Sequence, residues 1–262
     1  MRTVQEQEQI NLACKYHPQT KEQLRELCKD NSICLGDIDT SAITDMSKLF
    51  LKSRRKNFVG IENWDTSKVE LMSYMFAECR YFNADISNWN TSSLTRMDYM
   101  FYRAKSFNQN IDSWDVSKVS SMLFTFSHAV KFNQPLNSWN VANVVNMTGM
   151  FYECVSFNQP LDKWNVSKVI LMKAMFSAAI EFNQDLDSWN ISSRVRKDTM
   201  FAMAIKYRQE LKSWHLSDAE RRAMFLKSPR EKQSASAKFI SKIFNGYFKL
   251  NFYLMELFDR WF

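Results

Sequence analysis

Glycine and histidine are scarce in this chain of 262 residues, and each scarcity excludes a class of functional site. Only four glycines occur and they stand far apart, so no glycine-rich loop is available to cradle a phosphate or a dinucleotide. The three histidines are equally scattered, which excludes the residue spacings of zinc peptidases. We therefore expect no bound metal, no cofactor and no enzymatic activity.

Long apolar runs and paired cysteines are also missing. The N-terminal segment contains no apolar stretch of the length found in signal peptides, and no membrane-spanning run of apolar residues occurs anywhere. We therefore expect neither a signal peptide nor a membrane span, which leaves a cytoplasmic location open. The five cysteines form an odd number without a Cys-x-x-Cys pattern, so we expect free thiols and no disulfide framework.

The formal net charge of +7 is concentrated at one end of the chain. Residues 215–262 hold nine Lys and Arg side chains and five Asp and Glu side chains, a net charge of +4, whereas the rest is close to neutral. A nucleic-acid-binding protein usually carries a basic stripe on its body. We therefore expect no nucleic-acid partner.

Tryptophan supplies the strongest positive signal, because seven of the eight tryptophans are spaced by 25 residues. They are Trp64, Trp89, Trp114, Trp139, Trp164, Trp189 and Trp214. A fixed period between 20 and 50 residues is typical of stacked repeats, in which each repeat buries its apolar face against its neighbours.

Other residue types recur in phase with tryptophan and predict the structure of one coil. Met72, Met75, Phe76 and Cys79 follow the i, i+3, i+4, i+7 rule, and their counterparts recur in the next repeats, which predicts the inner face of a short helix. The segment 82–89 is too short for another helix and predicts a strand or an extended turn that pairs with the same segment of the next coil. The expected fold is an α/β repeat solenoid with one short strand and one short helix per coil.

Polar residues recur in the same phase. Asn83 and its counterparts every 25 residues form a column that, with the glutamines that follow most of them, predicts hydrogen bonds between coils. Ser67 begins a similar column of hydroxyl groups, which predicts bonds within turns and no set of nucleophiles.

The repeat divides the chain into parts. Residues 38–214 hold about seven repeats of 25 residues. Thr20 precedes a segment that predicts a capped helix, so residues 20–37 are expected to close the N-terminal end of the stack, and residues 1–19 are expected to be loose. A second capping helix is predicted within residues 215–228.

Residues 229–262 differ in kind from the repeats, because they are rich in aromatic and basic side chains. Three interpretations stay open for this tail: a helix folded back over the last coil, a helix that binds a partner or a second copy of the chain, and a helix that contacts a membrane surface.

The run from Phe132 to Val169, FNQPLNSWNVANVVNMTGMFYECVSFNQPLDKWNVSKV, resembles the repeats of BspA-like bacterial leucine-rich-repeat surface proteins. The stretch SICLGDIDTSAITDMSKLF resembles the N-terminal flank of that family, and the resemblance covers about residues 20–215. It implies a leucine-rich-repeat solenoid. It also implies a surface or secreted protein that binds molecules of a host or a neighbouring cell, and it carries no catalytic residues.

Two sets of residues are candidates for partner binding. An acidic stripe is expected on one face of the stack, either as a recognition face for a basic or hydroxylated partner or as a solvated turn face. Its acidic members are Asp85, Asp112, Asp162, Asp185 and Asp187. An aromatic row is expected off the inner face, either as an exposed contact patch or as lateral packing between coils. Its members are Tyr74, Tyr99, Tyr102 and Phe124.

These observations predict a non-catalytic, protein-binding repeat module on a bacterial surface or in contact with a host. The alternative is an intracellular or self-assembling scaffold that associates through the C-terminal aromatic tail.

Overall fold

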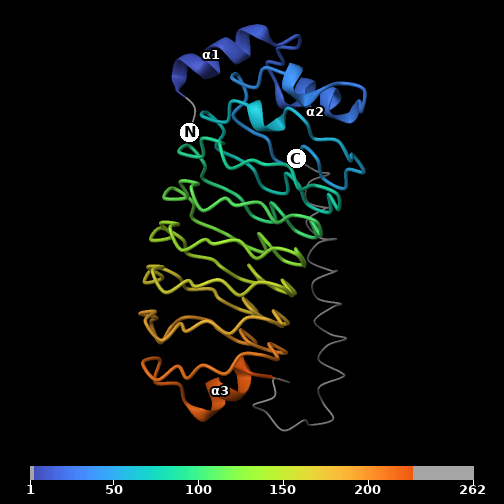
Figure 1. Ribbon diagram of the computed structural model, residues 1–262. Coiled ribbons are helices and arrows are strands. Elements are labelled where there is room, and N and C mark those ends of the chain that lie inside the picture. The colour runs from blue at the N-terminus through green and yellow to red at the C-terminus, as the bar shows by residue number, and fades with distance from the viewer. Residues whose placement is uncertain (1–2, 227–262) are drawn as a thin grey trace, which may run out of the picture.

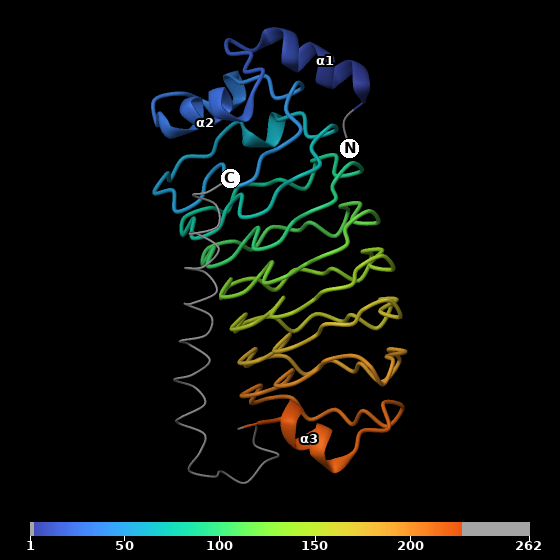
Figure 2. The same ribbon diagram turned by 180° about the vertical axis from the view of Figure 1, so that it is seen from behind.

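The computed structural model describes residues 3–226, and these form a stack of coils with helices at both ends (Figure 1). Two helices, α1 (Val4–Ala13) and α2 (Lys21–Lys29), lie at the N-terminal end, and α3 (Asp218–Met224) lies at the opposite end. The short 3-10 helices η1 (Leu35–Asp37) and η2 (Ile61–Asn63) belong to the first coils. Seen from behind, the coils follow one another without a break (Figure 2). The predicted tail, 229–262, and the last two residues of the predicted C-terminal cap lie outside the described residues.

Single-residue parallel bridges fix the register of the stack. Leu71 pairs with Arg96, Arg96 pairs with Ser121, and the series continues every 25 residues to Arg196. Asp45 pairs with Leu71, 26 residues on, because one residue is inserted before Trp64. Each coil therefore lies on the next with equivalent positions in line, as the period of the sequence predicts.

The short helix predicted for each coil is wrong, since no α-helix occurs among the described residues between η2 and α3. The segment that begins at Met72 forms a series of three-residue turns. Met75 donates its N–H to the carbonyl of Met72 at 3.1 Å, whereas Phe76 donates to Met100 of the next coil at 2.9 Å. Tyr74 has a φ of 59°, in the left-handed region that an α-helix excludes. Turns that close over three residues bring the side chains of residues i, i+3 and i+4 to one side. The same apolar pattern therefore fits both an α-helix and the observed series of turns.

The strand predicted over residues 82–89 is also wrong. The bridges occur at Leu71 and its counterparts, and the segment 82–89 pairs through side chains instead. Asn108 donates its N–H to Oδ1 of Asn83 at 2.8 Å, and Asn133 donates to Oδ1 of Asn108 at 2.9 Å. The β-pairing between the described coils consists of single-residue bridges and not of extended strands. The leucine-rich-repeat classification therefore stays a prediction.

Stacked aromatic columns form the core along the whole length of the stack. The rings of Phe76 and Phe101 are 5.8 Å apart at an interplanar angle of 7°, and those of Trp89 and Trp114 are 6.1 Å apart at 8°. Every tryptophan of the series donates its indole N–H to a buried carbonyl of the preceding coil, as Trp114 does to Ile86 at 3.1 Å. Each side chain thus supplies both apolar contact and a bond that ties adjacent coils together.

The cysteines of the core are free thiols. Cys79 and Cys154 are fully buried in the column where other coils place alanine. Burial raises the pKa of Cys79 to about 12 and raises the pKa of Cys154 as well. Both thiols therefore stay protonated at neutral pH and pack as small apolar groups.

The N-terminal segment was expected to be loose, and this is wrong for α1. Thr3 and Glu6 form a capping box, in which Thr3 Oγ1 accepts the N–H of Glu6 at 3.2 Å and Glu6 Oε2 accepts the N–H of Thr3 at 2.8 Å. No residue of α1 is buried. Gln7 instead ties the helix to the stack through a bond from Nε2 to the carbonyl of Asn63 at 2.9 Å.

The two ends of the stack are closed differently. At the N-terminal end, α2 follows the N-cap Thr20 and buries Leu24 and Cys28 against the first coil. At the other end, Ser217 caps α3, and Met224 and Phe225 are buried against the last coil. Among the described residues, no helix is long and apolar enough to cross a membrane.

Candidate binding groove

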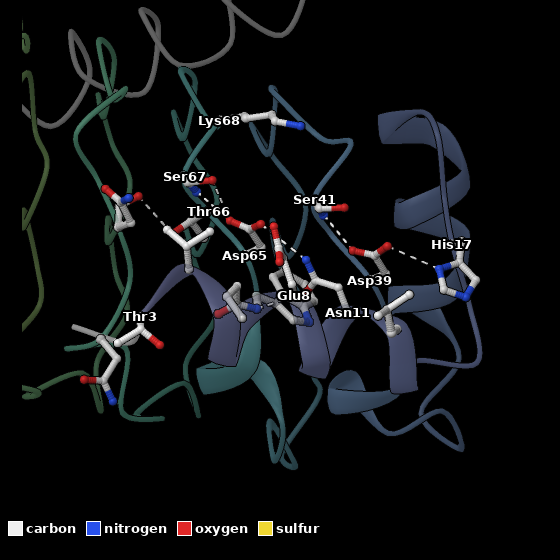
Figure 3. A pocket seen from close by; sticks show the side chains of 16 residues that line it. Thr3, Glu8, Asn11, His17, Asp39, Ser41, Asp65, Thr66, Ser67 and Lys68 are labelled. Atoms are coloured by element: carbon white, nitrogen blue, oxygen red, sulfur yellow. Dashed lines mark hydrogen bonds and ion pairs between the residues drawn. The ribbon is translucent and has the colours of Figure 1, made fainter.

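A groove of about 670 Å³ separates α1 from the turn edge of the first coils (Figure 3). On the helix side it is lined by Thr3, Glu8 and Asn11, among others. On the coil side it is lined mainly by residues that follow the tryptophan position in successive coils, together with His17 of the N-terminal segment and Asn88, which precedes Trp89. The polar ones are His17, Asp39, Ser41, Asp65, Thr66, Ser67, Lys68, Asn88 and Asn90.

A repeated turn holds the carboxylates of the coil side in place. Asp39 accepts the N–H of Ser41 at 2.9 Å, and Asp65 accepts the N–H of Ser67 at 3.0 Å. Such a bond from a side chain to the backbone two residues on fixes both the turn and the direction of the carboxylate. The same turn recurs down the stack, with Asp at position 115 and Asn at positions 90, 140 and 165.

The helix approaches this edge through a polar contact. Asn11 Nδ2 lies 3.4 Å from Asp65 Oδ2, and both side chains line the groove (Figure 3). Since α1 buries no apolar side chain, two side-chain bonds, from Gln7 and Asn11, connect its middle to the coils. The helix that forms the groove wall on this side is therefore held to the coils by polar contacts and buries no apolar side chain.

The charge of the groove is predominantly negative, with three carboxylates from Glu8, Asp39 and Asp65 against the ammonium group of Lys68. His17 Nδ1 lies 3.2 Å from Asp39 Oδ2. Burial alone would raise the pKa of Asp39, but the bonds from Ser41 and His17 outweigh it and lower the pKa. Asp39 is therefore ionised at neutral pH, and the groove suits a ligand with positive charge or hydrogen-bond donors.

The aromatic row is not an exposed patch, so that expectation is wrong for three of its four members. Tyr74 and Tyr99 are 8% exposed and Phe124 is 6% exposed, while Tyr102 is partly buried. The rings of Tyr74 and Tyr99 stack at 4.6 Å, and Phe124 follows at 5.2 Å from Tyr99. These rings form a second apolar cluster beside the main core, which is the lateral packing that the sequence left open.

The acidic stripe lies on turns and most of its carboxylates take part in them. Asp112 accepts the N–H of Ser138 at 3.0 Å, and Asp162 accepts the amide of Asn137 at 2.9 Å, so both bonds join successive coils. Asp187 accepts the N–H of Ser213 in the next coil, whereas Asp85 and Asp185 accept backbone N–H groups within their own turns. Asp85, Asp162 and Asp185 are exposed. The stripe is thus part of the turn structure and keeps a negative outer surface.

One serine–histidine–glutamate series occurs among the described residues. Ser127 Oγ lies 2.9 Å from Nδ1 of His128, and Nε2 of His128 lies 3.3 Å from Oε2 of Glu153. Sequence reasoning missed it, because Glu153 comes from the next coil. Ser127 is fully buried, and burial lowers the pKa of His128 against the opposing effect of Glu153. A substrate cannot reach this hydroxyl, so the series does not form a nucleophilic site.

No group of three or more His, Cys, Asp or Glu side chains within residues 3–226 is placed to hold a metal ion. The coil side of the groove presents carboxylates held by their own turns, and the Ser67 hydroxyl donates to Asp65 Oδ1 at 2.7 Å.

Comparison with known proteins identifies a family. The model of the family described as "Mycoplasma protein of unknown function, DUF285" matches residues 22–139 and again residues 121–239. No curated protein and no solved structure matches the chain. Two overlapping matches over most of the chain agree with its repeated construction. The chain belongs to the DUF285 family, which is associated with BspA-like repeat proteins.

Proposed function

We propose that this protein is a non-catalytic, protein-binding module of the leucine-rich-repeat type, and that its groove receives a basic, extended segment of a partner protein. The observation that carries the proposal is the groove beside α1, in which three carboxylates face a single ammonium group. A partner with lysine or arginine side chains would complement this charge, and carboxylate edges of fixed geometry suit bidentate contacts with arginine.

The rigidity of the coil side supports a binding role. Asp39 and Asp65 are held by their own turns before any partner arrives, so little side-chain entropy is lost on binding. The acidic stripe of Asp85, Asp112 and Asp162 continues the negative charge over further coils. An extended partner would therefore meet further carboxylates along the stack, interspersed with exposed lysines such as Lys163.

Charge-neutral variants of the groove test this proposal. The triple variant Glu8→Gln, Asp39→Asn and Asp65→Asn removes three charges, and asparagine already forms the same turn at position 90. The matched control is Asp115→Asn, which changes the same turn in a coil outside the groove.

Binding of a ten-residue lysine- and arginine-rich peptide is measured by calorimetry, with a glutamate-rich peptide as the negative probe. We expect the triple variant to bind the basic peptide at least about tenfold more weakly, or about 1.4 kcal/mol, with weaker binding at higher salt. The Asp115 control should bind as the unmodified protein does. Equal affinity of the triple variant and the unmodified protein would remove the groove from the proposal.

The resemblance to BspA-like proteins adds a location to the proposal, namely the outer surface of a bacterial cell. Protease treatment of intact native cells, with a cytoplasmic protein as control, tests it directly. Cleavage before lysis supports a surface role. Protection until lysis contradicts it and leaves an intracellular scaffold as the function of the same coil stack.

A further inference from the structure

A second cavity, of about 220 Å³, lies between α2 and the first coil, away from the proposed groove. Its lining is cationic and includes no carboxylate side chain. The charged members are Arg25, Lys29, Lys48, Arg54 and Arg55, and Asn31 and Ser53 add polar groups. Four of the five come from two short segments, the C-terminal half of α2 and the basic run 52–56, and Lys48 is the fifth.

Arg55 forms the fixed base of this cavity. Its side chain is buried, at 4% exposure, and donates to the carbonyls of Cys28 at 3.3 Å, Asp30 at 3.0 Å and Ile33 at 2.5 Å. These carbonyls belong to the C-terminal end of α2 and the residues that follow, where the helix dipole is negative. Arg55 therefore provides hydrogen bonds to the carbonyl groups at the C-terminal end of α2 and offsets their negative charge. As a result, this end of the helix does not repel an anion from the cavity.

Arg25, Lys29 and Arg54 line the cavity beside Arg55, and no carboxylate is among the lining residues. Arg25 and Lys29 are four residues apart on α2 and share one face, where like charges repel each other. Lys29 pairs with Glu26 at 2.6 Å, but both side chains are well exposed and such a pair contributes little. The nearby carboxylate of Asp30 accepts the N–H and hydroxyl of Ser32. Lys48 Nζ lies 5.8 Å from the ring of Tyr74.

We propose that this cavity binds a phosphate group. Arginine and lysine side chains are the usual ligands of phosphate oxygens, and the hydroxyl of Ser53, which accepts the N–H of Arg55 at 3.1 Å, keeps its own hydrogen to donate. The volume exceeds the roughly 30 Å³ that one water occupies in the liquid several times over, so a phosphate fits with part of its hydration. The phosphate group belongs either to a small soluble molecule or to a lipid headgroup.

Removal of two exposed cations tests the site without disturbing its base. The variant Arg25→Gln/Arg54→Gln keeps Arg55 and its bonds to α2, and the matched control Lys118→Gln/Lys163→Gln removes two exposed cations from distant coils. The full chain is titrated with inorganic phosphate at constant ionic strength, with chloride as the reference salt, and both the melting temperature and the binding heat are recorded.

We expect phosphate to raise the melting temperature of the unmodified protein and of the control, and to bind the Arg25/Arg54 variant about tenfold more weakly. An equal response of that variant and the control would overturn the proposal, and so would an equal effect of chloride. The groove variants of the proposed function retain this cavity, so the two proposals fail independently.

Vesicles distinguish the two sources of phosphate. Co-sedimentation is measured with phosphatidylcholine alone and with added phosphatidylglycerol. Binding of anionic vesicles that the Arg25/Arg54 variant loses and the lysine control keeps indicates a headgroup site. Binding of inorganic phosphate with vesicle binding unchanged in that variant indicates a soluble phosphate compound. Loss of neither activity in the variant would overturn the site.

Discussion

The ring of Phe124 lies against the α-carbon of Gly149 in the next coil, where the β-carbon of any other residue would stand. Gly149 has a φ of 58°, but Ala174 occupies the same position one coil further with a φ of 52°. The backbone conformation alone therefore tolerates a side chain in this column. The ring of Phe124 is what requires glycine at position 149.

The variant Gly149→Ala should destabilise the protein by about 1–3 kcal/mol, because the new methyl group overlaps the Phe124 ring and forces it to move. The free energy of unfolding is measured by urea denaturation. In a Phe124→Leu background the same change should be less destabilising, since the flat ring is gone. An equal loss in both backgrounds would show that the backbone and not the ring sets the requirement.

The repeat made the long-range order of this fold predictable. The 25-residue spacing of tryptophan predicts that Trp89 lies on Trp114, and their rings stack. The local structure could not be derived in the same way. Met72, Met75 and Phe76 present one apolar face both in a helix and in the turns observed, and the choice depends on Phe76 donating its N–H to the next coil. A backbone N–H that donates to the next coil cannot donate within a helix. The apolar pattern of the sequence does not show which of these two bonds forms.

Replacement of a central tryptophan should be more harmful than replacement of the last one. Trp139 is 2% exposed and donates its indole N–H to Ile111 at 2.9 Å. Trp139→Phe removes one of the two donors to that carbonyl, which also accepts the N–H of Trp114, and opens a void, so we expect a loss of about 2–4 kcal/mol of unfolding free energy. The matched control, Trp214→Phe, removes the same bond at the end of the series, where the ring is 8% exposed. The two losses, measured by urea denaturation, should differ by at least about 1 kcal/mol.

The asparagine ladder should tolerate an acid better than an apolar residue. Asn133 Oδ1 accepts the N–H of Asn158 at 2.9 Å and Nε2 of Gln159 at 3.0 Å. Asn133→Ala leaves both donors without this oxygen and should cost about 1–3 kcal/mol, whereas Asn133→Asp keeps an acceptor and should cost less. Thermal unfolding at neutral pH compares them. Equal losses would mean that the oxygen contributes nothing beyond packing.

The departure from this ladder at Arg208 has a structural reason. Arg208 donates its N–H to Oδ1 of Asn183 at 2.7 Å, so it still completes the previous coil. After it comes the last turn of the stack, and the ladder needs no further acceptor. At the end of the stack, arginine can therefore replace the asparagine of the ladder, and the hydrogen bond to the preceding coil is kept.

The candidate groove was less predictable than the coils. Asp65 and Ser67 belong to a repeated turn that the sequence displays openly. Glu8 and Asn11 lie in a polar segment without an apolar stripe, so the sequence offered no reason to fold it against the stack. The capping box of Thr3 and Glu6 was the one local signal for that helix, and it gives no position relative to the coils.

The C-terminal cap provides a test by pH. Lys197 stands in the column that methionine occupies in the preceding coils, is 7% exposed, and pairs with Glu220 of α3 at 2.7 Å. This bond to Lys197, with the two bonds from Ser217, lowers the pKa of Glu220 to about 2 from its ordinary value of 4.5. A carboxylate with a lowered pKa contributes stability above its unfolded value and loses it as the pH falls. We therefore expect the contribution of Glu220 to disappear between about pH 4.5 and pH 2.

Two variants isolate this pair from the general effect of acid. Glu220→Gln should lose less unfolding free energy than the unmodified protein between about pH 5 and pH 2, when stability is followed by urea denaturation at each pH. Glu181→Gln is the control, since its pair with Lys206 is exposed on both sides and should leave the pH profile unchanged. Lys197→Met restores the residue of the other coils and removes a largely buried charge, so it should reduce the same pH dependence at little cost at neutral pH, while the bonds from Ser217 to Glu220 remain. If the free energy of unfolding still falls steeply with pH in both Glu220→Gln and Lys197→Met, the pH dependence arises from other carboxylates and not from the cap.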